Sequence, residues 1–467
     1  MKKHPHMKTK ITHLALLLLL TVSSAIAQQP PVDMQKRAEE LKNLKWGMFI
    51  CWSFSTFSEK EWTPGITDIS FFRATSVDTD QWARTAKEAN MGYILFLTKH
   101  HDGFCLWDTK TTDRKVTKAP LGRDVLAELK KSCDKYGIKL ALYFSEGDWT
   151  WPGAKDGAVG GSGQDAAKER QQLTELLSNY GPIEYMWVDH AAGTGGLSHA
   201  EFIAHCKALQ PGCFIGFNHG DQTGVRIRLG EMGKPGPLTD NSGAGYNKGV
   251  PSKDYLLAEF TYPILPNHKG GAMWFYSLPE HDNLCHPAEK LYNDYLGAVK
   301  YGNIFSLDVG PDYNGKLREI DVKTLRQIGQ MIKNPPPVPV SENKPAQASS
   351  AWGAGYEADK AVDGDPATRW GAAPDSRNGW LEVDMQKETK VARALVMEIL
   401  GSTRTQEFAI EYKAGETWKP VVTGTTLGRS KILEFPPVSA RFFRLNILKA
   451  NEVPTIEEFR LFPPATR

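Results

Sequence analysis

The fold is indicated by one stretch, residues 183–190 (IEYMWVDH), in which an apolar run ends on a carboxylate. Valine, isoleucine and aromatic residues favour a β-strand, and the small residues at 191–196 have the composition of a loop. Asp189 should therefore stand at the C-terminal end of a strand, where parallel barrels carry their chemistry. An isolated Asp at such a position more often caps a turn. The surrounding sequence has to decide between these two interpretations.

Apolar and β-branched runs alternate with helix-like segments on both sides of this stretch. The alternation predicts eight strands over about 250 residues, which fits a (β/α)8 barrel, an α/β fold. The expected strands are 46–50, 92–97, 138–144, 183–188, 213–217, 255–260, 272–276 and 303–309. The expected helices are 80–90, 124–136, 166–180, 198–209, 289–300 and 321–333. Residues 220–250 are rich in Gly, Pro and Asn and are expected to form a long loop.

A proline-rich segment, residues 335–339 (PPPVP), separates this pattern from the rest of the chain. Such a segment cannot continue a helix and stiffens the chain. We therefore expect a barrel domain at 28–334, a linker at 335–342 and a second domain at 343–467. Short alternating runs without a clear long helix predict that the second domain is an all-β jelly-roll sandwich.

The first 27 residues have the pattern of a cleaved secretory signal peptide, so a periplasmic or extracellular protein is expected. Four lysines precede an apolar run at 14–20, which is too short to span a membrane. Removing these lysines, with no acid among them, changes the formal net charge from +2 to −2. A nearly neutral chain without basic runs gives no support to nucleic-acid binding. The six cysteines are scattered, and their spacing predicts no disulfide.

Polar side chains follow the second expected strand in residues 99–104 (KHHDGF). They should gather at the same barrel mouth as Asp189, because His100 and His101 can both turn inward in a loop past the strand end. A metal site needs three or four converging ligands, and no HExxH-type spacing is present. Hydrogen bonding to a polar substrate is therefore preferred over zinc. Histidines that belong to the core are the alternative interpretation.

Acids and tryptophans on or after several expected strands indicate a carbohydrate substrate. An aromatic face covers the apolar side of a sugar ring, while acids and histidines bond its hydroxyls. Tryptophan is also common in barrel cores, so the joint placement of these residues matters more than any one of them. They are Glu61, Trp62, Trp107, Trp149, Trp151, Trp187 and Trp274.

A second carboxylate, Glu259, lies near the end of the sixth expected strand. Hydrolysis of a glycoside needs two carboxyls, one ionised and the other kept protonated to assist the leaving oxygen. Asp189 and Glu259 are a candidate pair. Residue type does not exclude five competitors from expected loops, namely Glu146, Asp148, Glu231, Asp240 and Glu280.

Eight short stretches in chain order carry a family resemblance. They are 46–50 (WGMFI), 61–62 (EW), 78–82 (DTDQW), 98–107 (TKHHDGFCLW), 187–189 (WVD), 258–259 (AE), 274–276 (WFY) and 307–311 (LDVGP). Residues 46 to about 330 thereby resemble glycoside hydrolase family 29, the α-L-fucosidases, and most closely the branch acting on α-1,3/1,4 linkages. The resemblance implies an exo-acting enzyme that works without a catalytic cofactor on fucosylated oligosaccharides or glycoconjugate glycans.

The same resemblance assigns roles to individual residues. It implies a retaining double displacement with Asp189 as nucleophile and Glu259 as general acid/base. The candidate sugar contacts are Glu61, Trp62, His100, His101, Trp187, Trp274 and Cys51.

One departure from the family concerns Cys51, where a His usually touches the sugar. A thiol donates weakly and does not replace the hydrogen bond of an imidazole. An α-L-galactoside or another 6-substituted relative of fucose is therefore an alternative substrate. A catalytically decayed, lectin-like protein is a second alternative, although the presence of Asp189 and Glu259 favours an enzyme. A metal-dependent hydrolase using His100 and His101 would need further ligands.

Residues 361–370 (AVDGDPATRW) and 456–459 (IEEF) resemble the F5/8 type C, or discoidin-like, sandwiches, which include carbohydrate-binding module family 32. Hard oxygen ligands suit a structural Ca²⁺, and the candidates here are Asp363, Asp365, Thr368 and Glu458. A sugar-binding role and a purely structural role are both open for this domain.

Overall fold

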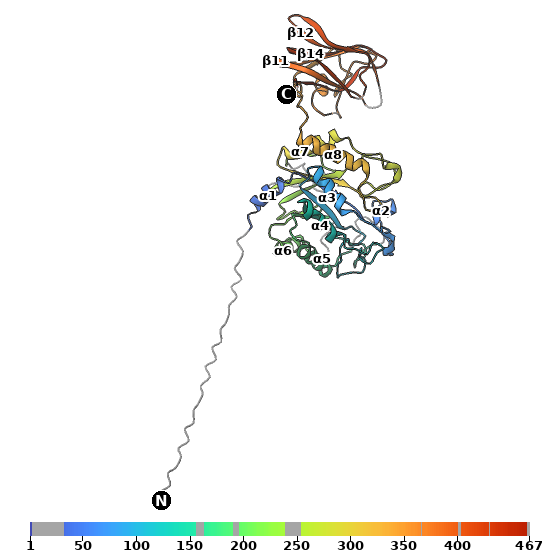
Figure 1. Ribbon diagram of the computed structural model, residues 1–467, viewed down its shortest axis with the longest axis vertical. Coiled ribbons are helices and arrows are strands. Elements are labelled where there is room, and N and C mark those ends of the chain that lie inside the picture. The colour runs from blue at the N-terminus through green and yellow to red at the C-terminus, as the bar shows by residue number, and fades with distance from the viewer. Residues whose placement is uncertain are drawn as a thin grey trace. The chain divides into compact units, whose positions relative to one another are not determined.

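The computed structural model describes residue 1 and residues 32–155, 163–189, 196–238, 254–365, 367–399, 403–428 and 430–464. The chain divides into two compact units, Met1–Lys333 and Asn334–Arg467 (Figure 1). Residues 2–27 of the predicted signal peptide lie outside the described residues, and so does Asp240. Within the described ranges, no helix has the length and apolar character needed to cross a membrane.

The first unit contains an eight-stranded parallel sheet in the order β5-β4-β3-β2-β1-β8-β7-β6. The two ends of this path meet, because a Cβ atom on Gly216 of β5 would lie 2.8 Å from the side chain of Leu229 on β6. This nearly closed barrel confirms the predicted fold class. The strands are β1 (Trp46–Ile50), β2 (Tyr93–Lys99), β3 (Lys139–Ser145), β4 (Tyr185–Asp189), β5 (Phe214–Phe217), β6 (Ile227–Glu231), β7 (Leu257–Pro263) and β8 (Ile304–Val309).

Helices surround these strands, and short polar side chains fix where several of them begin (Figure 1). Asp78, Asp124, Asp165 and Ser198 each accept a hydrogen bond from a backbone N–H of the first turn. The helices are α1 (Met34–Lys42), α2 (Phe54–Ser58), α3 (Thr79–Glu88), α4 (Val125–Tyr136), α5 (Ala166–Asn179), α6 (His199–Leu209), α7 (Ala288–Val299) and α8 (Glu319–Lys333).

One expected strand is wrong and one strand was not expected: residues 272–276 form no strand, and β6 lies inside the segment expected to be a loop. β6 escaped recognition because Arg228 and Gly230 interrupt its apolar run. Arg228 is nevertheless fully buried, with its guanidinium 5.6 Å from the ring centroid of Tyr255. The strand expected sixth, at 255–260, is therefore β7, and it extends to Pro263.

The second unit is all-β and antiparallel, with its sheet in the order β10-β15-β11-β14-β12-β13 and β9 paired to β11. Side chains along the first part of β11 alternate between buried and partly exposed, as expected of a strand with one face on a core. Trp370 is fully buried in that core. The strands are β9 (Ala346–Ala348), β10 (Trp370–Gly371), β11 (Gly379–Glu398), β12 (Thr405–Ala414), β13 (Thr417–Gly424), β14 (Lys431–Ala450) and β15 (Thr455–Phe462).

Candidate active site

The C-terminal ends of the parallel strands bring several polar side chains to one face of the barrel. β4 ends on Asp189 and β6 ends on Glu231. The segment after β2 carries His100 and His101, and the segment after β5 carries Asn218. The barrel mouth therefore holds two carboxylates among hydrogen-bonding groups.

Both oxygens of Asp189 face hydrogen-bonding groups from neighbouring strand ends. The Tyr143 hydroxyl donates to Oδ2 at 2.7 Å, and the Asn218 amide nitrogen donates to Oδ1 at 3.1 Å. Two imidazole nitrogens complete the surroundings, with His101 Nε2 3.5 Å from Oδ2 and His219 Nε2 3.2 Å from Oδ1. Donated hydrogen bonds favour the ionised form of a carboxyl, so this environment suits a nucleophile.

Glu231 is the second carboxyl at this position. The Asn218 amide nitrogen that donates to Asp189 also donates to Glu231 Oε2, at 2.7 Å. Burial raises the pKa of Glu231 to about 7, and the negative charge of Asp189 adds to the increase. One carboxyl is thus surrounded by donors while its neighbour holds a proton near neutral pH, which is the division of roles that glycoside hydrolysis needs.

Glu259 does not stand at a strand end as expected. It is the third residue of β7, in register with Leu229 and with Ile304, the first residue of β8. Its side chain is fully buried, and its Oε2 accepts a hydrogen bond from Trp187 Nε1 at 3.2 Å. The predicted placement at the barrel mouth is therefore corrected: Glu259 lies inside the barrel, because β7 is longer than its sequence suggested.

Trp187 connects this interior carboxyl with the site. Its ring stacks on Tyr143 with centroids 5.3 Å apart, and Tyr143 donates to Asp189. Because the indole N–H of Trp187 is directed to Glu259, any sugar contact has to come from the ring. Glu259 therefore supports the position of Trp187 and, through it, of Tyr143.

Two further predicted sugar contacts, Glu61 and Trp274, are joined by hydrogen bonds. Glu61 Oε2 accepts the backbone N–H groups of Met273 at 2.8 Å and Trp274 at 3.3 Å. The N–H groups of Met273 and Trp274 thus bind a side chain, and residues 272–276 do not form the expected strand. The Trp274 ring lies 6.0 Å from the ring of Phe49, measured between centroids. Trp62, which follows Glu61, is 44% exposed, so its aromatic face is accessible.

The paired histidines are both buried, with ring centroids 4.1 Å apart. Nδ1 of His101 is 2.7 Å from the Ser145 hydroxyl, while its Nε2 faces Asp189. His100 packs edge-on against Phe275. In the part of the chain that the structure describes, no group of three or more His, Cys, Asp or Glu could hold a metal ion.

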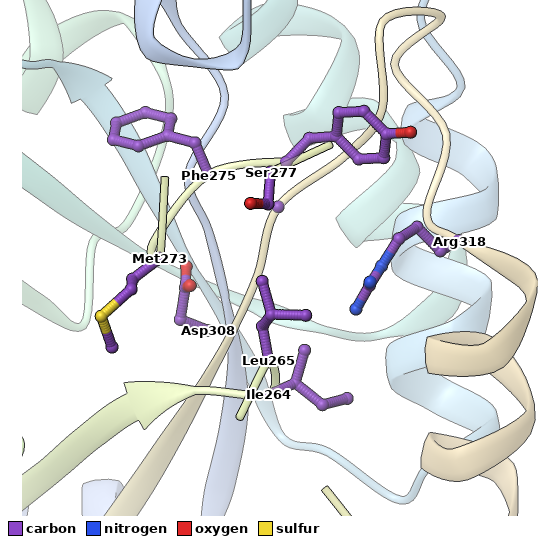
Figure 2. Close-up of a pocket in the computed structure, with 9 residues that line it drawn as sticks. Ile264, Leu265, Met273, Phe275, Ser277, Asp308 and Arg318 are labelled. Carbon is purple, nitrogen blue, oxygen red and sulfur yellow. The ribbon is translucent and has the colours of Figure 1, made fainter. Parts of the chain in front are cut away.

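Cys51 directly follows β1 and is buried, with its thiol hydrogen-bonded to Asp308. Burial raises the pKa of Cys51 far above its ordinary value, so the thiol keeps its proton. Figure 2 shows Asp308 and Met273 on one side of a small cavity that has Arg318 on its other side. Asp308 was not singled out as a site residue from the sequence, although it belongs to one of the family-like stretches.

The other competitors have surroundings of their own. Asp148 is buried, lies 3.5 Å from Lys99 Nζ and accepts the Thr150 hydroxyl. Glu280 is largely exposed. These positions leave Glu231 as the competitor that the structure links to Asp189 through a shared donor.

Glu146 is fully buried beside another fully buried acid, Glu169 of α5. Both oxygens of Glu146 and one of Glu169 have no hydrogen-bond donor among the described residues, while Leu197 N–H donates to the remaining Glu169 oxygen at 2.9 Å. Ionising both of two carboxyls that are buried together costs much free energy, so we expect this pair to share one proton. Burial, followed by the neighbouring charge of Glu169, raises the pKa of Glu146.

Replacing Glu146 by Gln should raise thermal stability by an amount that grows with pH. A carboxyl whose pKa is raised on folding binds more protons in the folded state, so the wild type loses stability as pH rises above the ordinary Glu pKa of about 4.3. The Gln variant does not titrate there. We expect equal melting temperatures near pH 4 and an increasing gain for the variant toward pH 8. Glu184→Gln, which removes one of the two acidic partners of Arg37, should give no such gain. A constant difference across this range would contradict the shared proton.

The predicted calcium ligands lie in the second unit. The Thr368 hydroxyl is 2.8 and 3.0 Å from the two oxygens of Asp363, and Asp365 N–H donates to Asp363 at 3.0 Å. Glu458 is fully buried, with Oε2 bound by Arg460 at 3.2 Å and Oε1 without a hydrogen-bond partner among the described residues. Burial raises the pKa of Glu458 to about 7, and the negative charge of Asp363 contributes.

Comparison with known proteins gives two family matches. The model described as Alpha-L-fucosidase matches residues 22–335, and the model described as F5/8 type C domain matches residues 345–459. Alpha-L-fucosidase 1 of Arabidopsis thaliana is 27% identical over 462 residues, which cover 90% of this chain and 86% of the plant protein. Plasma alpha-L-fucosidase of Homo sapiens is 24% identical over 275 residues, which cover 56% and 55% of the two chains.

The solved structure of a Ruminococcus gnavus GH29 fucosidase in complex with fucose has the same fold. It matches with a TM-score of 0.55 at 22% identity, and the match covers 94% of this chain and 97% of the other.

Proposed function

The chain belongs to the alpha-L-fucosidase family, and from that premise we propose that it is a retaining, exo-acting enzyme that releases terminal α-L-fucose from glycans. In this proposal Asp189 is the nucleophile, and Glu231 takes the place of Glu259 as general acid/base. The main support for this assignment is that the amide nitrogen of Asn218 donates a hydrogen bond to both carboxyls.

The shared donor limits the separation of the two carboxyls. Asp189 Oδ1 and Glu231 Oε2 lie 3.1 and 2.7 Å from the same nitrogen, so the sum of these distances, 5.8 Å, is the largest separation these oxygens can have. Retaining glycosidases keep their carboxyl groups about 5 to 5.5 Å apart, whereas inverting enzymes leave about 6.5 to 9.5 Å for a water molecule. The spacing supports direct attack by Asp189.

The reaction proceeds in two displacements. Asp189 forms a bond to the anomeric carbon while Glu231 gives its proton to the departing glycosidic oxygen, and the bond between that oxygen and the sugar breaks. Glu231, now ionised, takes a proton from water, which attacks the same carbon and releases Asp189. A Glu231 pKa of about 7 supports both roles, because the group is then readily protonated and deprotonated near neutral pH.

The substrate that we propose is a fucosylated glycan, with α-1,3/1,4 linkages preferred. The accessible ring of Trp62 supports contact with a sugar's apolar face. Cys51 favours an alternative substrate, an α-L-galactoside, because its side chain is smaller than the imidazole usual in this family. Its thiol is also hydrogen-bonded to Asp308. A fucoside presents a methyl group where a galactoside presents a hydroxymethyl group.

A substrate panel tests the proposed function. Release rates should be measured on an aryl α-L-fucoside, the matching aryl α-L-galactoside and fucosylated oligosaccharides. We expect kcat/KM to be highest for the fucosides. Faster release from the galactoside would establish the alternative sugar, and no release from any of them would show the decayed, lectin-like protein.

We also propose that the chain is exported to the periplasm or the cell exterior, which is supported by the lysines and the apolar run at its start.

Calcium removal should lower the melting temperature of the second unit in the full chain. We propose a structural Ca²⁺ bound by Asp363, Asp365, Thr368 and Glu458, supported by the buried Oε1 of Glu458, which has no hydrogen-bond partner among the described residues. The three acids are not grouped for a metal in this structure, so the ion would have to draw them together. Backbone carbonyls would have to complete the ligand set. Calorimetry with excess chelator should show a downward shift that added Ca²⁺ reverses. Identical transitions with chelator and with Ca²⁺ would contradict the ion.

A further inference from the structure

Asn218 occupies a fixed position between the strands that carry the two carboxyls. It directly follows β5, and its backbone N–H donates to the carbonyl of Val188 at 2.8 Å, so it extends the ladder between β5 and β4. Val188 is the residue before Asp189. Asn218 is 1% exposed, and its side chain is therefore held by packing as well as by its backbone.

The amide nitrogen of Asn218 has two hydrogens and faces two carboxyl oxygens. It donates to Asp189 Oδ1 at 3.1 Å and to Glu231 Oε2 at 2.7 Å. Glu231 Oε2 belongs to the last residue of β6, so this one group ties together the ends of β4, β5 and β6. The barrel closes between β5 and β6 where the side chain of Leu229 packs against Gly216. The hydrogen bond from Asn218 to Glu231 adds a polar contact between the ends of these two strands.

We infer that Asn218 is a positioning residue that holds the nucleophile Asp189 and the acid/base Glu231 at the spacing that double displacement requires. The inference rests on the proposed function. Catalytic groups have to stay within about 0.5 Å of their productive geometry, and a displacement of about 1 Å can cost about 100-fold in rate. Without a common donor, nothing among the contacts named here would fix the spacing of the two carboxyls, and their proximity would raise the pKa of the pair further.

The same bridge has an electrostatic consequence. Its hydrogen bond to Glu231 lowers the pKa of that carboxyl, against the raising effects of burial, Asp189 and Glu61, while His219 also lowers it. Around Asp189 the other facing groups are Tyr143, His101 and His219. Loss of the amide should therefore favour the protonated form of both carboxyls.

Asn218→Ala should reduce kcat about 100-fold with a smaller change in KM, because the substrate's binding groups remain. In the plot of kcat/KM against pH, both the acidic and the basic limb should move to higher pH, since the nucleophile and the acid/base each bind their proton more tightly. Asn218→Asp keeps the shape and places a third carboxyl beside the other two, so both limbs of its pH profile should move further in the same direction. This isosteric variant provides the test if the Ala variant does not fold.

Asn303→Ala is the matched control. Asn303 is also 1% exposed, donates to the Gly236 carbonyl at 2.9 Å and accepts Ala258 N–H at 2.8 Å. Its removal should lower the melting temperature without moving either pH limb.

Wild-type kcat and unshifted limbs in a folded Asn218 variant would overturn the inference, even if the Asp189 and Glu231 variants lose activity on fucosylated oligosaccharides as proposed. A wild-type chain that releases no sugar would instead overturn the proposed function, so the two failures are distinguishable.

Discussion

Replacing Asp189 by Asn should lower kcat on aryl α-L-fucoside by about 10⁴-fold or more, the scale of loss seen when a covalent nucleophile is removed. The substitution keeps the shape of the side chain and its place beside Tyr143 and Asn218. Substrate binding should therefore change little. Product release by the variant and the wild type should be compared in end-point assays with long incubation, and the melting temperature of both proteins should be measured in parallel.

The control for this substitution is Asp321→Asn. Asp321 is a fully buried carboxyl in the same unit, but it binds Arg318 at 2.7 Å and lies on α8. Its loss should lower stability while the folded enzyme keeps its kcat. An Asp189→Asn variant with more than about a tenth of wild-type kcat would exclude Asp189 as nucleophile.

Glu231→Gln should lower kcat/KM by about 10² to 10⁴-fold on fucosylated oligosaccharides and by little on an activated aryl fucoside. An oligosaccharide leaving group needs a proton as the bond breaks, whereas an activated phenolate leaves without one. The relevant readout is the slope of log kcat/KM against the pKa of the leaving group for a series of aryl fucosides. This slope should be steeper for the variant.

Glu259→Gln is the paired variant, because Glu259 is the residue that the sequence favoured. Its carboxyl lies inside β7 and accepts from Trp187, so the substitution should affect both substrate types equally and modestly. A leaving-group dependence that appears in Glu259→Gln and not in Glu231→Gln would return the acid/base role to Glu259.

Much of this fold could be predicted from hydrophobic runs alone. Seven of the eight barrel strands coincide with expected runs, because buried parallel strands such as β1, with all five residues buried, have nearly continuous apolar sequences. β6 was missed because Arg228 is polar and Gly230 is a poor strand former. The buried guanidinium next to Tyr255 shows that tertiary contacts override composition there.

Some residues of the candidate site could likewise be predicted from apolar runs, whereas others are visible only in the structure. Asp189, His100 and His101 were recognised because each follows an apolar run, and the structure places Asp189 and His101 within 3.5 Å of each other. Asn218 and His219 follow the expected fifth strand in the same way, so the same rule would have found them. Tyr143 lies within β3 in register with Trp187, and only its side-chain hydrogen bond in the structure shows that it faces Asp189.

The error at Glu259 has a specific physical origin. The apolar pattern does not indicate that β7 continues past Phe260, because Thr261, Tyr262 and Pro263 form a less apolar end. A strand end placed three residues too early put Glu259 at the mouth instead of the interior. Glu231 was one of five competing acids and not the favoured partner, since its strand was expected to be part of a loop.

We propose that Asp189 and Glu231 stand close enough for double displacement. Proton NMR of the sugar formed in the first moments of hydrolysis, before mutarotation, is the test of this claim. Their separation of at most 5.8 Å predicts that the α-anomer of L-fucose appears first, with the configuration of the substrate retained. First appearance of the β-anomer would contradict the claim, because it would require a water molecule between the two carboxyls.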